Sequence, residues 1–149
     1  AENGRMLRLP MLILRAKARV PGAEPVLVLG GGPGASAIAA FARLPAPLRD
    51  AHPLRHSHDL IVLDQRGTPL AGPGSMHCHE LERDYAAGER FASSAEVGAA
   101  AVRCRTRLAA QGIDTGRYDS ANSADDLEDL RRLFGPAWGF RRWHVVGTS

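Results

Sequence analysis

The sequence is poor in aromatic residues and almost lacks lysine. Phe, Trp and Tyr make up 5% of the 149 residues, and Lys17 is the only lysine among 19 basic residues. The formal net charge is +3, and the arginines are scattered along the chain. A nucleic-acid groove needs clustered basic residues, commonly with aromatic side chains on which bases stack. The composition therefore argues against a nucleic-acid partner.

Long hydrophobic runs are also missing. No apolar stretch approaches the roughly 18 residues that a transmembrane helix needs, so the sequence predicts no transmembrane segment. Hydrophobic residues make up 44% of the chain and charged residues 23%, which are ordinary globular values. These proportions exclude collagen-like, coiled-coil and largely disordered proteins, and the length favours one domain with a buried core.

Cysteine is scarce, and Cys78 and Cys104 are too far apart for the close pairwise spacing of a zinc site. The two cysteines could form a disulfide, worth about 3 kcal/mol in the chain-entropy model. Two free thiols in a cytosolic protein are the other possibility, and composition leaves both open. His77 and His79 lie in a loop rich in Pro and Gly without the spacing of a known metal site, so we expect no metal.

Apolar runs alternate with helical patterns along the chain. Runs at about 26–29, 60–64 and 143–146 have the uninterrupted hydrophobic character of parallel strands buried on both faces. Residues 6–20 alternate apolar and basic residues and are interrupted at Pro10, which suits a half-exposed strand or hairpin. This order predicts an α/β protein with a mainly parallel sheet, in which ligands bind at the carboxyl ends of the strands.

Three helices are expected between these strands. The first runs from Ala35 to about Arg43, and the second begins near Ala95 after a long irregular excursion over residues 68–94.

The third helix is expected from about 123 to 134, with Ser123 and Asp126 in a capping-box arrangement and Gly135-Pro136 as its end. We attribute the acidic residues near its start to the helix dipole rather than to acid–base catalysis. They are Asp125, Asp126, Glu128 and Asp129.

Two strand ends carry residues suited to chemistry. The first apolar run leads into Gly30-Gly31-Gly32-Pro33-Gly34, where glycine lets the backbone turn tightly and present N–H groups to an anion. The last run leads into Gly147-Thr148-Ser149, a Gly-x-Ser that is typical of the strand-to-helix turn of a nucleophile elbow. Each pattern is weak alone, but in this order they favour a serine hydrolase.

The Gly30–Gly34 segment resembles the HGGPG oxyanion motif of α/β-hydrolases related to proline iminopeptidase, with Gly30 where those proteins usually have histidine. Asp59–Gly67 is similar to the D-x-R-G segment of the same family. The sequence departs from the family at Thr68–Gly72, where many members have Gly-x-Ser.

The resemblance spans roughly residues 25–149. Cys104–Gly112, Tyr118 and Ser123–Leu133 resemble the stretch before the elbow in the secreted tripeptidyl-aminopeptidase-like branch. That branch implies a secreted or periplasmic protein, in which Cys78 and Cys104 would be bonded to each other.

The resemblance also implies an α/β-hydrolase fold, of which residues 1–149 are the N-terminal part. Ser149 would be the nucleophile, and the backbone N–H of Gly32 would be an oxyanion donor, since Pro33 has no N–H. The residues expected to support these two motifs are Gly31, Pro33, Gly34 and Gly147.

The acid and the histidine of an α/β-hydrolase triad follow the serine along the chain. We therefore expect them in a C-terminal half beyond Ser149, which could be a second polypeptide, together with a cap domain that selects the substrate. The implied enzyme is an aminopeptidase that releases N-terminal residues of peptides through an acyl-enzyme, with small amides or esters as other substrates. It implies no metal or organic cofactor.

Two other functions stay open. Gly30, Gly32 and Ala35 also satisfy the G-x-G-x-x-A fingerprint of a flavin- or NAD-binding oxidoreductase. That fingerprint needs an acid about 20 residues later at a strand end, whereas Asp50 lies in a loop and Asp64 arrives about 30 residues after the turn. A non-catalytic α/β-hydrolase-like binding module would share every feature except a working serine.

Overall fold

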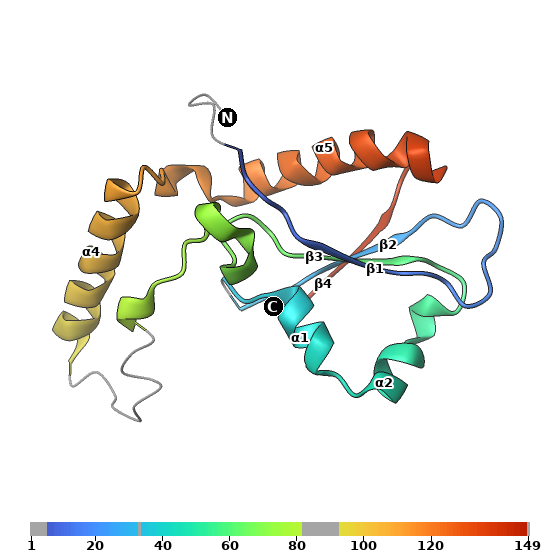
Figure 1. Ribbon diagram of the computed structural model, residues 1–149, viewed down its shortest axis with the longest axis horizontal. Helices are drawn as coiled ribbons and strands as arrows, with labels where there is room; N and C mark the ends of the chain where they lie inside the picture. The colour runs from blue at the N-terminus through green and yellow to red at the C-terminus, as the bar shows by residue number, and fades with distance from the viewer. Residues whose placement is uncertain (1–5, 33, 82–92, 149) are drawn as a thin grey trace.

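The structure is a computed structural model that describes residues 6–32, 34–81 and 93–148 (Figure 1). Pro33 and Ser149, two of the predicted site residues, lie outside these ranges. Within the described residues, no helix combines the length and the apolar character needed to cross a membrane.

A four-stranded mixed sheet lies at the centre of the described residues (Figure 1). Its strands are β1 (Met11–Leu14), β2 (Val26–Leu29), β3 (Leu60–Leu63) and β4 (His144–Gly147), in the spatial order β1-β3-β2-β4. β2 is parallel to both of its neighbours, β3 and β4, and β1 is antiparallel to β3. The three predicted parallel strands therefore belong to one sheet, and the segment after Pro10 adds a single antiparallel edge strand.

The helices occupy the connections between strands. The α-helices are α1 (Ala37–Arg43), α2 (Ala46–Asp50), α4 (Ser94–Ala110) and α5 (Ser120–Trp138). Short 3₁₀ helices are η1 (Pro53–Arg55), η2 (Pro69–Gly74) and η3 (Thr115–Arg117). The predicted helices thus form at the expected places in the chain, and η2 gives the excursion after β3 a short regular segment.

Side chains of β2 and β3 alternate between the two faces of the sheet, and helices pack on both faces. One core cluster consists of Val26, Leu60 and Val62 with Ala37 and Phe41 of α1. The other consists of Leu27, Ile61 and Leu63, against which Leu127, Leu130, Trp138 and Trp143 pack. The sheet is therefore the middle layer of three, as expected for an α/β protein.

The sequence analysis predicted that β4 is a third strand buried on both faces, and the predicted burial is wrong. All four of its residues are exposed, and the exposed fractions of Val145 and Val146 are 54% and 41%. Among the described strands, β4 lies at the edge of the sheet and pairs with β2 alone. Within the described residues, nothing packs over it well enough to bury these valines.

The start of α5 also corrects the sequence analysis. The helix begins three residues before Ser123, and its N-cap is Asp119, whose side chain accepts the backbone N–H of Asn122 at 2.7 Å. Ser123 is therefore not the cap. Asp125 and Asp126 lie in the second turn, beyond the first turn where the helix dipole acts on carboxylates.

The end of α5 lies beyond Gly135-Pro136, which was predicted to terminate it. The helix continues to Trp138 and stops at Gly139, whose φ of 75° is the left-handed conformation of a glycine cap. Pro136 lacks an N–H and removes one hydrogen bond from the helix. Trp138 packs on the core of the sheet and stacks on Phe134, with 4.7 Å between the ring centroids. This packing outweighs the tendency of Gly135-Pro136 to end the helix.

The excursion after β3 is joined to α4 by a disulfide between Cys78 and Cys104, whose Cα atoms are 5.5 Å apart. Cys104 belongs to a small core cluster with Leu108 and Ile113, outside the sheet. The disulfide and this cluster attach α4 to the rest of the chain.

Candidate functional site

The order of the strands creates a crevice at one edge of the sheet. From β2 the chain passes through α1 to β3 on one side, and from β3 it returns through α4 and α5 to β4 on the other side of β2. In open α/β sheets, ligands bind outside the carboxyl ends of strands where the connections diverge in this way. The expected binding site therefore lies at the ends of β2 and β4.

The two predicted motifs meet at this place. Leu29, the last residue of β2, is paired in register with Gly147 of β4. The backbone N–H of Thr148 then donates to the carbonyl of Leu29 at 3.3 Å. The residues that follow Leu29 and Gly147 therefore leave the ends of neighbouring parallel strands side by side.

A cavity of ≈ 350 Å³ lies between these segments and a third one. Glycines 30–32 and Gly34 contribute the first part of its wall, and Thr148 contributes from the end of β4. Gln65, Arg66 and Thr68 come from the loop after β3. Three loops at the carboxyl ends of three strands thus surround one space of the size that a substrate group requires.

Gly32 adopts the backbone conformation that the sequence analysis anticipated for a tight turn. Its φ is +61°, and its carbonyl accepts the N–H of Ala35 at 2.9 Å. Gly34 also has a positive φ, of +83°. Within the described residues, the N–H of Gly32 forms no hydrogen bond, so this cavity-lining donor is available to an anion.

Gly30 is packed tightly against the first residue of α1. A Cβ atom placed on Gly30 would lie 3.0 Å from the Cβ of Ala37 and 3.2 Å from its Cα. The HGGPG motif that this segment resembles has histidine at this position. Here the helix approaches the turn so closely that a side chain would force the backbone to shift.

Asp64, at the end of β3, holds the start of α1 in place. It is completely buried, its Oδ2 accepts the hydroxyl of Ser36 at 2.7 Å, and its Oδ1 accepts the N–H of Ile38 at 3.0 Å. The Ser36 hydroxyl oxygen in turn caps the helix by accepting the N–H of Ala39. Both Asp64 oxygens are therefore used for structure.

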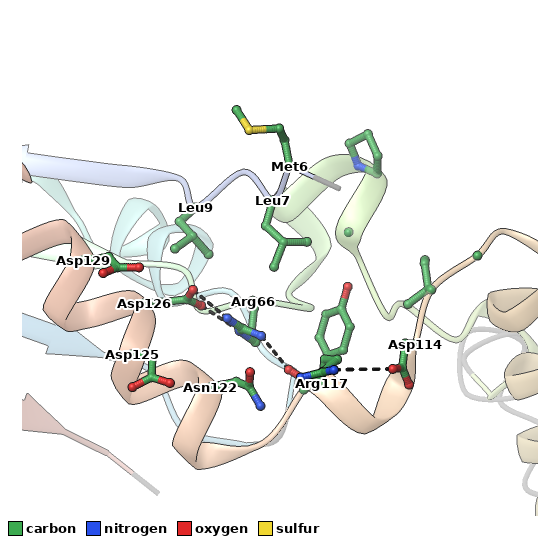
Figure 2. A pocket seen from close by; sticks show the side chains of 15 residues that line it. Met6, Leu7, Leu9, Arg66, Asp114, Arg117, Asn122, Asp125, Asp126 and Asp129 are labelled. Carbon is green, nitrogen blue, oxygen red and sulfur yellow. Dashed lines mark hydrogen bonds and ion pairs between the residues drawn. The ribbon is translucent and has the colours of Figure 1, made fainter. Parts of the chain in front are cut away.

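Arg66 connects the same loop to α5. Its Nε and Nη2 donate to the two carboxylate oxygens of Asp126 at 2.7 and 2.6 Å, and its Nη1 donates to the carbonyl of Arg117 at 2.6 Å (Figure 2). Hydrogen bonding to Asp126 raises the pKa of Arg66. Asp126 is thus a partner of Arg66 and neither a capping residue nor a dipole-stabilising one.

Arg66 also borders a larger cavity of ≈ 620 Å³ between the N-terminal segment and α5 (Figure 2). Leu7 and Leu9 line it on one side, and Asp125 and Asp129 line it on the other. No serine, cysteine or histidine of the described residues lines this cavity. We place the chemistry at the smaller cavity, because the glycine turn and the end of β4 meet there.

The residues around the disulfide are the only described group with metal-ligand atoms close together, namely Cys78, Glu80 and Cys104. Two of the three are bonded to each other and offer no thiolate. Glu80 forms a two-point ion pair with Arg107, at 2.7 and 3.0 Å, and these hydrogen bonds lower the pKa of Glu80 to about 2. The arrangement is that of a structural cross-link.

The structure thus brings Gly30, Gly31, Gly32 and Gly34 to one cavity and pairs Gly147 with Leu29 beside it, whereas Pro33 and the predicted nucleophile Ser149 lie outside the described residues. The sequence analysis missed the Arg66–Asp126 pair. Arg66 stood in the D-x-R-G segment, but no local signal identified a partner so distant along the chain. Compared with known proteins, the chain matches no protein-family model, no curated protein and no solved structure significantly.

Proposed function

We propose that this chain carries the nucleophile and the oxyanion turn of a serine hydrolase with an α/β-hydrolase fold. One observation carries the proposal. The glycine turn after β2 and Thr148, which follows β4, border the same cavity at the carboxyl ends of adjacent parallel strands. In a nucleophile elbow the serine is presented at this edge, next to a backbone donor from the earlier strand–helix loop.

In the proposed reaction, the Ser149 hydroxyl attacks the carbonyl carbon of an amide or ester while a histidine takes its proton. The N–H of Gly32 stabilises the resulting oxyanion together with the N–H of the residue after Ser149. The C–N or C–O bond then breaks, the leaving group takes the proton from the histidine, and water hydrolyses the acyl-enzyme. Losing one oxyanion donor typically lowers the rate about 10²–10³-fold.

The exposure of β4 supports a further part of the proposal, a polypeptide segment that pairs with its free edge. Val145 and Val146 point to opposite faces of the sheet because successive strand residues alternate. A strand that is apolar on both faces is typical of a sheet interior, yet both valines are exposed. We propose that the segment covering them supplies the triad acid and the histidine.

The class of substrate follows from the resemblance described above, which favours an aminopeptidase that releases N-terminal residues of peptides. The same resemblance favours a secreted or periplasmic enzyme. The Cys78–Cys104 disulfide supports this location, because disulfides persist mainly in oxidising compartments. A thiol assay on denatured, unreduced protein is expected to find no free thiol. Two thiols per chain would contradict the bonded state.

The structure gives reasons against the dinucleotide-binding alternative. Asp64 ends a strand, but its side chain is completely buried and its two oxygens hold the start of α1, so it is not exposed to a ribose hydroxyl. Asp50 lies at the end of α2 and pairs with Arg55. Neither acid is placed as the fingerprint requires. A hydrolase therefore accounts for the turn better than an oxidoreductase.

Labelling of the complete enzyme with a fluorophosphonate tests the proposal. The enzyme consists of this chain together with the segment that supplies the acid and the histidine. We expect one label per enzyme on Ser149, loss of label in Ser149→Ala, and full labelling in Ser94→Ala, a matched control that removes the hydroxyl of an exposed serine at the start of α4. No label on the wild type would favour the non-catalytic binding module, and a label on another residue would overturn the assignment of Ser149.

A further inference from the structure

The loop after β3 is fixed at two points to helices that pack on opposite faces of the sheet. Asp64 binds Ser36 and Ile38 at the start of α1. Two residues later, Arg66 binds the carboxylate of Asp126 on α5 through two hydrogen bonds (Figure 2). Both members of this ion pair are largely shielded, since the exposed fractions of their side chains are 11% and 18%.

Gly67, the next residue of this loop, is packed just as closely. A Cβ atom on Gly67 would lie 2.8 Å from Cδ1 of Tyr118, and the carbonyl of Gly67 accepts the N–H of Met76 at 2.8 Å. The φ of Gly67 is +83°, a conformation that other residues rarely adopt. The loop therefore has little freedom to move while Arg66 stays bound to Asp126.

The same loop borders the catalytic cavity together with the glycine turn. The turn leads directly into Ser36, the N-cap of α1, which is bonded to Asp64. A continuous series of contacts therefore runs from Asp126 through Arg66 and Asp64 to the segment that contains Gly32.

We propose that Arg66, held by Asp126, is a positioning residue for the oxyanion turn. In this inference Arg66 acts through Asp64 and Ser36, because its Nε, Nη1 and Nη2 each donate to Asp126 or Arg117 and hold the guanidinium against α5 and η3. This inference rests on the proposed hydrolase function and adds to it a residue that sets the position of the Gly32 donor.

The expected consequence is a selective loss of kcat. An oxyanion donor contacts the charge that develops in the transition state, so its displacement lowers kcat and leaves KM nearly unchanged. Displacements of about 1 Å in an active site can cost about 100-fold in rate. We therefore expect kcat to fall about 10- to 100-fold when the Arg66–Asp126 pair is broken.

The test compares Asp126→Asn with Asp129→Asn in the complete enzyme. Asp129 lies three residues later on α5 and is exposed, which makes it a matched control. We expect Asp126→Asn to lower kcat, with KM within about 2-fold of the wild type, while Asp129→Asn keeps both constants. Equal kcat values in the two variants, with wild-type labelling at Ser149 intact, would overturn the inference and leave the proposed function standing.

A second variant separates positioning from simple loss of stability. Arg66→Ala leaves a space that free guanidinium can fill, and millimolar guanidinium is expected to restore part of kcat, whereas the same concentration of sodium is not. A variant that is only less stable would keep the kcat of its folded fraction and would not respond to guanidinium, which would refute a positioning role. Failure of the wild type to label at Ser149 would instead refute the hydrolase proposal itself.

Discussion

β3 and β4 flank the same strand in the same direction, but their surroundings are opposite. Every residue of β3 is buried, with exposed fractions of 0–2% (Leu60–Leu63), whereas every residue of β4 is exposed. The two strands have similar apolar centres, Ile61-Val62 and Val145-Val146. β3 is covered by α1 on one face and by residues of α5 on the other. The two strands of similar sequence therefore differ in burial because, within the described residues, the helices cover β3 and leave β4 exposed.

A row of three valines across the sheet offers the sharpest comparison. Val62 of β3, Val28 of β2 and Val146 of β4 are partners in register and share one face. Val62→Ala is expected to lower the free energy of unfolding by about 2 kcal/mol, because it removes buried methyl groups and leaves a cavity. Val146→Ala in the same chain is expected to cost less than about 0.5 kcal/mol, as at other exposed positions.

Urea denaturation of the three variants measures this series, with Val28→Ala expected between the other two. Equal losses at Val62 and Val146 in this chain would contradict the exposed state of β4. In the complete enzyme, the loss at Val146 should rise towards that at Val62, because the proposed segment covers β4.

The carboxyl ends of β2 and β4 differ in how closely other residues pack around their glycines. Gly30 after β2 is in contact with Ala37, whereas a Cβ atom on Gly147 of β4 would meet nothing within 4 Å. Gly30→Ala is expected to destabilise this chain by about 1–3 kcal/mol, since overpacking forces a backbone shift. Gly147→Ala should be tolerated to within about 0.5 kcal/mol. Thermal unfolding of both variants checks this, and the reverse order would refute the assignment of the crowded and open ends.

The smallest expected effect lies outside the sheet, in the ion pair next to the disulfide. Hydrogen bonds from Arg107 lower the pKa of Glu80 from 4.5 to about 2. A carboxyl group whose pKa is lowered on folding stabilises the folded protein at pH values above its pKa in the unfolded state. This stabilisation is lost as the pH falls through the pKa of the folded state. The contribution of Glu80 is therefore present above about pH 4.5 and disappears towards about pH 2.

Stability curves of the wild type and Glu80→Gln between pH 7 and pH 2 measure this contribution. The two curves are expected to converge as the pH falls through this range. A difference that stays constant down to pH 2 would show that the Glu80 carboxylate is not the titrating group. The sheet should show no comparable dependence on this substitution.

The sequence predicted much of the sheet because short apolar runs are a local signal. The runs at Val26–Leu29 and Leu60–Leu63 form parallel strands as expected, and the structure shows that they are neighbours. The burial of β4 was predicted wrongly. The apolar side chains of Val145 and Val146 indicate that a strand is suited to burial, but they do not indicate whether another segment covers it. The extension of α5 past Pro136 was missed since its cause, the packing of Trp138, is tertiary.

In the candidate site, too, features with a local sequence signal were predicted and features that depend on tertiary partners were not. Glycines at the end of β2 and before Ser149 were visible in the sequence. The fold places the described glycines after β2 at one cavity and pairs Gly147 with Leu29 beside it. The roles of Asp64 and Arg66 were not visible, because each depends on a partner from another element. Asp64 binds a helix start distant in sequence, and Arg66 binds Asp126, which the local pattern assigned to the helix terminus.

A crystal structure of the complete enzyme after reaction with a phosphonate tests the central claim most directly. The claim predicts that phosphorus is bonded to Oγ of Ser149, and that the phosphonyl oxygen accepts the N–H of Gly32 at about 2.7–3.1 Å. It further predicts that this oxygen lies in the cavity between the glycine turn and the end of β4. A phosphonyl oxygen directed away from the glycine turn, or phosphorus bonded to any other residue, would contradict the claim.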